Sequence, residues 1–188
     1  EIQDQRTSII KVNHIRGEVS ISDPKASTGQ GPKTFHPDDA FNSETSQKDI
    51  YDCVAFPIVD SVLHGYNGTI LAYGQTDAGK TYTMQGNINS RELTGVIPRA
   101  IEQIFNRIES TPNKQFLVRV SFFEIYNEEV HDLLGKDPKN QLKVRENSDS
   151  ESYVEGLLSI PVETAAKAYQ KLVTGIQNRE MRLIRMGE

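Results

Sequence analysis

The sequence has 188 residues and a formal net charge of -5 at pH 7, with 21 lysines and arginines against 26 aspartates and glutamates. This length predicts one domain or part of one, and the acidic balance disfavours a general polyanion binder, so we expect no nucleic-acid partner. No apolar run approaches the ~18 residues of a membrane-spanning helix, and we expect no membrane partner either. The single cysteine, Cys53, cannot form an intrachain disulfide and fits a reducing compartment such as the cytosol.

The N-terminal third of the chain predicts a hairpin, a loop and one helix. Apolar residues on both sides of Arg16-Gly17 predict two short strands joined by a turn, and residues 22–34, rich in Gly, Pro, Ser and Lys, predict a loop. From 46 to 64 apolar residues recur at helical spacing. We therefore expect a helix that kinks at Pro57 and ends at Gly65.

The rest of the chain alternates between strand and helix patterns. Residues 69–73 form a short apolar run between two glycines and predict a strand that is buried on both faces. A helix starting near Lys80 is interrupted over 86–95 and resumes from Val96 to Ile108. A central strand, a shorter strand and a final helix are predicted over 116–126, 141–145 and 163–185. This alternation predicts an α/β fold of layered helices and sheet.

The strongest motif is a phosphate loop between the predicted strand at 69–73 and the helix that follows. Residues 74–81, GQTDAGKT, match G-x-x-x-x-G-K-S/T in the required context of strand before and helix after. In such a loop the backbone N–H groups point at phosphate oxygens, and the helix N-terminus adds partial positive charge. Lys80 would reach the β- and γ-phosphates, and the Thr81 hydroxyl would ligate Mg²⁺. The alternative is an ordinary glycine turn that leads into a helix.

Asp77 is unusual within this loop. Its carboxylate would lie near the charge of a bound triphosphate, and like charges in close approach weaken binding unless the side chain points to solvent or to a cation. Two interpretations stay open, an exposed residue at the loop tip and a residue that weakens nucleotide binding.

The residues that complete the catalytic site of a phosphate-loop enzyme are not visible in the sequence. Such enzymes hold the metal with a carboxylate at the end of a second apolar strand and position the attacking water with another residue. Residues 56–60, FPIVD, end in aspartate but lie in a helical pattern that contains a proline. The sequence also contains no guanine-reading N-K-x-D.

Several segments resemble the kinesin motor domain and occur in the order of that family. They comprise the signature around the phosphate loop at 66–84 and the downstream segments GVIPRA, SFFEIYNEEVHDLL and GIQNR, at 95–100, 121–134 and 175–179. The resemblance runs from about Gly17 to the C-terminus. Finer features at 85–86, 116–118 and 134–135 are similar to plus-end-directed kinesins of intraflagellar transport.

The resemblance implies an α/β fold of the P-loop NTPase type, a three-layer sandwich in which helices flank a central mixed sheet. It implies that residues 1–188 are part of a motor domain, the half that holds the phosphate loop. The first strand of the family, both nucleotide-sensing switches and the main microtubule-binding elements have no counterpart in the sequence. Because strands missing from a sheet leave unpaired edges, we expect poor solubility.

The resemblance also implies a function, an ATP-hydrolysing motor that moves along microtubules in the cytoplasm or cilium. The cofactors would be ATP or ADP and Mg²⁺, with Lys80 and Thr81 as catalytic residues and Thr81 as the Mg²⁺ ligand. This half alone is expected to bind nucleotide without efficient hydrolysis, and dimerisation would need regions outside it. The implied nucleotide-binding residues are Gly74, Gln75, Thr76, Asp77, Ala78, Gly79, Lys80, Thr81 and Tyr82.

Residues 140–159 are implied to form a lobe of strand and loop that touches tubulin. Lys143 and Arg145 are candidate contacts there, because tubulin is acidic and basic side chains gain from its field. The alternative for both residues is a solvated strand face.

Two other function classes remain open from the sequence. One is a non-catalytic, motor-like module that binds microtubules or a partner and uses nucleotide structurally or not at all. The other is an unrelated phosphate-loop enzyme such as a small-molecule kinase or a GTPase. The intact Lys80-Thr81 pair argues against complete loss of nucleotide binding, and the missing guanine motif argues against a GTPase.

Overall fold

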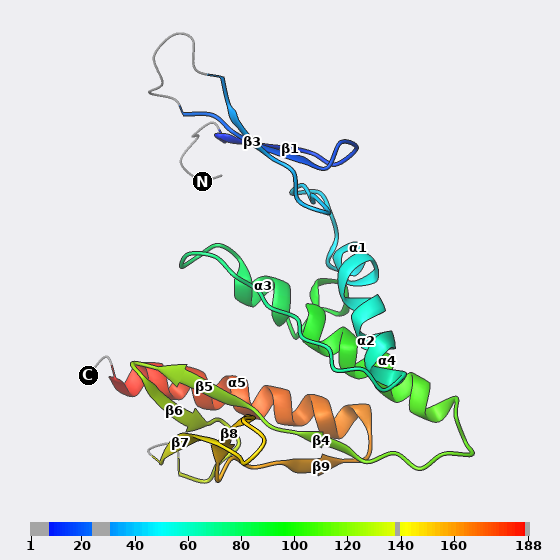
Figure 1. Cartoon of the computed structure of the whole chain (residues 1–188), viewed down its shortest axis with the longest axis vertical. Coiled ribbons are helices and arrows are strands. Elements are labelled where there is room, and N and C mark those ends of the chain that lie inside the picture. Colours follow the sequence, from blue (N-terminus) through cyan, green and yellow to red (C-terminus); the bar gives the residue numbers. More distant parts are fainter. Residues whose placement is uncertain (1–7, 24–30, 138–139, 187–188) are drawn as a thin grey trace.

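The structure is a computed structural model that describes residues 8–23, 31–137 and 140–186, with residues 180–186 described by their backbone (Figure 1). Three small antiparallel sheets and a set of helices make up the described chain. Within these residues no helix is both long and apolar enough to cross a membrane.

The N-terminal sheet confirms the predicted hairpin and adds a third strand. β1 (Ile10–Asn13) pairs with β2 (Glu18–Ile21), and the turn between them contains Gly17 at a positive φ of 61°. β3 (Lys33–Phe35) pairs with β2, so the end of the segment predicted as a loop is a strand. Residues 24–30 of that predicted loop lie outside the described residues. Figure 1 shows this sheet apart from the other two sheets.

The helix predicted over 46–64 is present in three pieces. α1 (Gln47–Ile50) runs into a π-helix (Tyr51–Ala55) and then into α2 (Phe56–Leu63). The break falls at the predicted place, because Pro57 has no N–H to donate to the carbonyl four residues earlier and the Phe56 N–H reaches back to Tyr51 instead. The helix ends just before Gly65, which has a φ of 100°.

The strand predicted over 69–73 is wrong for the described chain. No strand pairs with this segment among the described residues, and Leu71 and Tyr73 are 83% and 95% exposed rather than buried. A strand needs neighbours that satisfy its N–H and C=O groups, and an apolar run alone does not provide them.

The single central strand predicted over 116–126 is also wrong, because the segment divides between two sheets. β4 (Val118–Val120) pairs with β9 (Ile160–Val162), whereas β5 (Phe123–Tyr126) pairs with β6 (Glu129–Asp132). β7 (Gln141–Glu146), which confirms the shorter predicted strand, continues the second sheet to β8 (Ser152–Glu155). Every pairing is antiparallel, so the described strands do not themselves assemble the implied mixed sheet.

The two long helices are present as predicted. α4 (Val96–Glu109) presents one apolar stripe, and α5 (Ala165–Met186) runs beside β4 and β5 in Figure 1. Gly175 allows the Phe122 ring to approach the backbone of α5 closely, since a Cβ at this position would lie 2.1 Å from the ring. Phe122 joins β4 to β5, so the sheet packs directly on the helix at this point.

Two buried clusters meet along α4. One contains Tyr51, Ala55 and Val96, and the other contains Phe105, Val162 and Ala168. The first lies between α4 and the helix 47–63, and the second joins α4 to α5 and to the sheet of β4 and β9. α4 is therefore the element that connects the helical half to the sheet half.

Burial of Tyr51 generates a prediction about alkaline stability. Removal of the phenol from water raises its pKa to about 12. Below pH ~10 the phenol is protonated in both states, but as the pH rises towards about 12 the unfolded chain ionises first and the folded state loses stability. We expect Tyr51→Phe to lose less stability than the wild type between these pH values.

Urea unfolding followed by circular dichroism at several pH values from about 9 to about 12 measures this difference. Tyr66, which is 70% exposed, supplies the control substitution Tyr66→Phe, for which no change in slope is expected. Equal losses for the wild type and Tyr51→Phe would contradict the prediction.

Candidate functional site

The segment 74–79 forms a tight loop in front of the short helix α3 (Lys80–Met84). Gly74 and Gly79 have φ values of 154° and 85°, and the Ala78 N–H donates to the Gln75 carbonyl at 3.2 Å. Gly79 is the N-cap of α3 and has no side chain to cap the helix. Residues 75–79 are exposed, so the backbone of the loop is accessible to a ligand.

Lys80 lies against the inside of this loop. Its Nζ donates to the carbonyls of Gly74 at 2.8 Å and Gln75 at 2.5 Å, which places the ammonium charge within the curl. A depression of about 290 Å³ adjoins it, lined by Asp77, Gly79, Lys80, Thr81 and Tyr82. Five of the predicted residues thus line one open depression, in which the Lys80 ammonium and the loop N–H groups are the features that suit an anionic ligand and Asp77 is the one negative charge.

Asp77 has a conformational reason to stand in the loop. Its φ is 63°, in the left-handed region that Gly, Asn and Asp tolerate better than other residues. The side chain is exposed, as one of the two interpretations expects, and it lines the depression. Its effect on nucleotide binding stays a prediction. Reading the sequence for charge alone missed the backbone requirement.

The interruption at 86–95 folds back onto α3. Gly86 and Thr94 form an isolated antiparallel bridge, and the Gly95 N–H donates to the Gln85 carbonyl at 3.0 Å. A Cβ on Gly95 would lie 2.5 Å from the Thr83 carbonyl oxygen, and Gly86 has a φ of 67°. Glycine at both ends allows the base of this loop to press on the end of α3.

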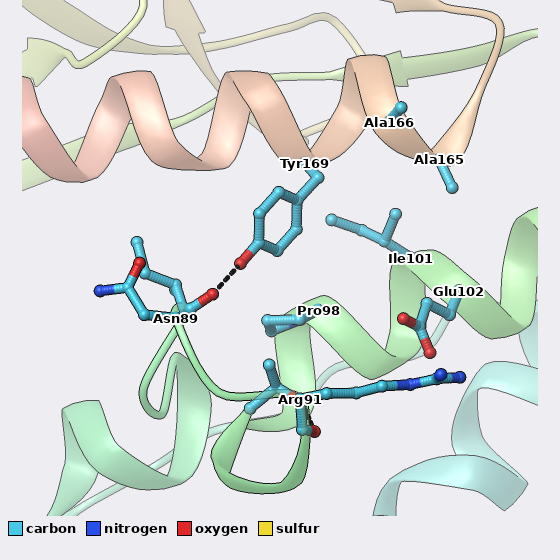
Figure 2. Close-up of a pocket in the computed structure, with 10 residues that line it drawn as sticks. Asn89, Arg91, Pro98, Ile101, Glu102, Ala165, Ala166 and Tyr169 are labelled. Carbon is cyan, nitrogen blue, oxygen red and sulfur yellow. Dashed lines mark hydrogen bonds between the residues drawn. The ribbon is translucent and has the colours of Figure 1, made fainter.

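Side chains from two helices hold the middle of the same loop. From α5, the Tyr169 hydroxyl donates to the Ile88 carbonyl at 2.7 Å, as the dashed line in Figure 2 shows. From α4, the Arg99 guanidinium donates to the carbonyls of Thr94 and Glu92, each at 3.0 Å. A cavity of about 350 Å³ lies between the loop, α4 and α5, with Tyr169, Pro98 and Ile101 on its walls. No motif in the sequence singles out Tyr169 for this contact, which joins residues 81 positions apart.

Lys143 and Arg145 lie on β7, outside the depression. They occupy alternate positions of one strand and therefore share a face. Arg145 Nε lies 3.0 Å from the Glu155 carboxylate on β8, and for Lys143 the described residues show no ion pair. Both are exposed.

Comparison with known proteins agrees with this geometry. A family model described as the kinesin motor domain matches residues 1–188. The chain belongs to the kinesin family. Kinesin-like protein KIF3C from Pongo abelii and from Mus musculus are similar to it, each 43% identical over 172 residues that make up 92% of this chain.

A solved structure of a fast kinesin, reported with implications for ATPase mechanism and interactions with microtubules, matches with a TM-score of 0.90 and 37% identity over 100% of this chain. The likeness confirms the α/β fold of the P-loop NTPase type. This kinesin chain spans 22% of the length of the KIF3C proteins and 52% of the fast kinesin chain.

Asp77 permits a test of charge at the loop. Asp77→Asn keeps a residue that tolerates the left-handed backbone and removes the negative charge, so we expect tighter binding of Mg-ADP. Exposed charges interact by about 0.2–1 kcal/mol, which corresponds to an increase in affinity of up to roughly fivefold. Titration calorimetry at low and high salt measures the affinity of both proteins for Mg-ADP. The difference in affinity between Asp77→Asn and the wild type should shrink at high salt.

The matched control is Glu109→Gln, which removes one exposed negative charge from the end of α4. This control separates the local effect at the loop from the effect of net charge. Equal affinities for Asp77→Asn and the wild type at low salt would show that the Asp77 carboxylate points away from the bound phosphates.

Proposed function

We propose that this kinesin chain is the nucleotide-binding part of a microtubule-based motor that uses ATP. The observation that carries the proposal is the loop 74–79 curled around the Lys80 ammonium, at the start of α3 and next to an open depression. Family membership supports ATP as the nucleotide and microtubules as the track.

The chemistry of the loop residues fits a phosphate ligand. Residues 74–82 would bind the nucleotide, with the loop N–H groups and the Lys80 ammonium as donors to phosphate oxygens. Lys80 would exchange its two loop carbonyls for phosphate oxygens, since a charged acceptor forms the stronger hydrogen bond. The Tyr82 ring is 53% exposed at the edge of the depression, where it can contact the rest of the nucleotide.

Magnesium is the cation that the site suits. Thr81 is exposed, lines the depression next to Lys80 and carries a hydroxyl, and hard oxygen ligands are those that Mg²⁺ prefers. When bound, the ion supplies charge that neutralises the phosphate oxygens. Thr81 is thus the residue of this chain proposed to hold it.

Hydrolysis needs more than this site supplies. Phosphoryl transfer requires a residue that orients the attacking water in addition to the residues that bind phosphate and metal. Lys80 and Thr81 have the binding roles, so we propose that this part of a motor domain binds nucleotide and turns it over poorly. Microtubule-stimulated ATPase activity is proposed for the complete motor.

The β7 face is the proposed contact with tubulin. Lys143 and Arg145 are exposed on one face of this strand, and basic side chains gain from the field of an acidic partner. We propose a location on microtubules in the cytoplasm, with the cilium as a further location because residues 85–86, 116–118 and 134–135 resemble kinesins of intraflagellar transport.

Calorimetric titration with Mg-ADP tests the nucleotide site. We expect saturable binding by the 188-residue chain and its loss in Lys80→Ala, because the ammonium donates to the bound phosphates. Lys114→Ala, at an exposed lysine beyond α4, is the control and should bind like the wild type. No binding by a wild-type chain that unfolds cooperatively would refute the proposal.

Co-pelleting with microtubules tests the β7 face. Charge reversal in Lys143→Glu should weaken binding by roughly three- to tenfold at low salt and less at high salt. Lys114→Glu, the same charge change elsewhere on the surface, should have a smaller effect. Microtubule binding that is unchanged by Lys143→Glu would place the contact elsewhere. Microtubule binding that is the same with and without nucleotide would favour a non-catalytic module.

A further inference from the structure

The helix that carries Lys80 and Thr81 has little to hold it in place by itself. α3 has five residues, none of them buried, and its N-cap Gly79 contributes no side-chain hydrogen bond. Helices this short are unstable in isolation, because few hydrogen bonds offset the cost of ordering the backbone. The position of Lys80 and Thr81 therefore depends on contacts that other elements make with α3.

Two contacts secure the C-terminal end of α3. Met84 packs against the buried cluster of Tyr51, Ala55 and Val96. The base of the loop 86–95 presses on the same end through Gly95, whose N–H donates to the Gln85 carbonyl. Neither contact reaches the middle of the helix.

Gln47 supplies the contact in the middle. Its Nε2 donates to the Tyr82 carbonyl at 2.7 Å, across 35 residues of sequence. The N–H groups of Gln85 and Gly86 both donate to the Thr81 carbonyl, so the backbone after α3 leaves the Tyr82 carbonyl for this amide. Among the described residues, no other side chain outside the phosphate loop donates to the backbone of α3.

Gln47 is itself held firmly. It is 6% exposed and is the first residue of α1, directly after the N-cap Ser46. Ser46 and Asp49 form a reciprocal capping box, in which the Asp49 N–H donates to the Ser46 hydroxyl oxygen at 3.1 Å. A buried side chain on a capped helix end is a rigid donor, as the support of a binding site requires.

We propose that Gln47 is a positioning residue for nucleotide binding, which fixes α3 through the Tyr82 carbonyl so that Lys80 and Thr81 face the phosphates. The assignment rests on the proposed nucleotide-binding function of the loop. Loss of the amide donor would leave a carbonyl without its hydrogen bond and let α3 shift on its contacts at Met84 and Gly95. The consequence is weaker binding of phosphate in a chain that still folds.

The test compares Gln47→Met with Tyr51→Phe. Gln47→Met keeps the length of the side chain and removes its donor, and we expect Mg-ADP affinity to fall three- to tenfold, about 0.7–1.4 kcal/mol. Tyr51→Phe removes the hydroxyl that donates to Gln103 on α4 and keeps the ring in the cluster on which Met84 packs. It should lower the melting temperature without changing the affinity. Gln47→Leu, which removes the same donors and adds no charge, replaces Gln47→Met if that variant does not fold.

Amide hydrogen exchange of the nucleotide-free chain gives a readout that does not depend on nucleotide. Exchange at residues 83–85 should be faster in Gln47→Met, with that of the middle of α4 unchanged. Two outcomes would overturn the role of Gln47 and leave the proposed function intact. One is exchange at 83–85 that does not change in Gln47→Met. The other is an unchanged affinity of Gln47→Met in an experiment where the wild type binds Mg-ADP and Lys80→Ala does not. A folded wild type that does not bind Mg-ADP overturns the proposed function and the inference together.

Discussion

A five-residue helix cannot hold itself in place, and in this kinesin chain such a helix carries the two residues on which the proposed chemistry depends. Lys80 and Thr81 open α3, which has no buried residue. Its position follows from the Gln47 amide, from Met84 on the buried cluster and from the glycines at the base of the loop 86–95. The geometry of the phosphate loop is therefore a property of elements well before and well after it in the sequence.

α4 transmits this dependence to the rest of the molecule. Val96 at its start belongs to the cluster beneath α3, and Phe105 near its end belongs to the cluster that joins α5 and the β4–β9 sheet. The loop 86–95 is tied to α4 by Arg99 and to α5 by Tyr169. Because packed elements shift together, a change at the phosphate loop has a continuous path of contacts towards α5.

The two proposed functional surfaces belong to separate parts of the fold. The phosphate loop leads into α3, whereas Lys143 and Arg145 stand on β7 in the sheet of β5–β8. Asn178 of α5 donates to the Leu133 carbonyl beside that sheet, and Gly175 admits the Phe122 ring. α5 thus touches both the loop 86–95 beside the proposed nucleotide site and the sheet that carries the proposed tubulin contact.

The sequence by itself determined the features that depend on neighbours in the chain. Local patterns predicted the tight loop before α3, the helix from Val96, the final helix over 163–185, the strand β7 and the break at Pro57, because periodicity, glycine and proline act on neighbouring residues. That the loop binds phosphate stays a proposal. Only the tertiary structure decided which segments pair. It left 69–73 without a partner among the described residues and divided 116–126 between two sheets. It also joined Gln47 to Tyr82 and Tyr169 to Ile88, across 35 and 81 residues. Hydrogen bonds between residues far apart in the sequence form only when the fold places both partners, so no local pattern predicts them.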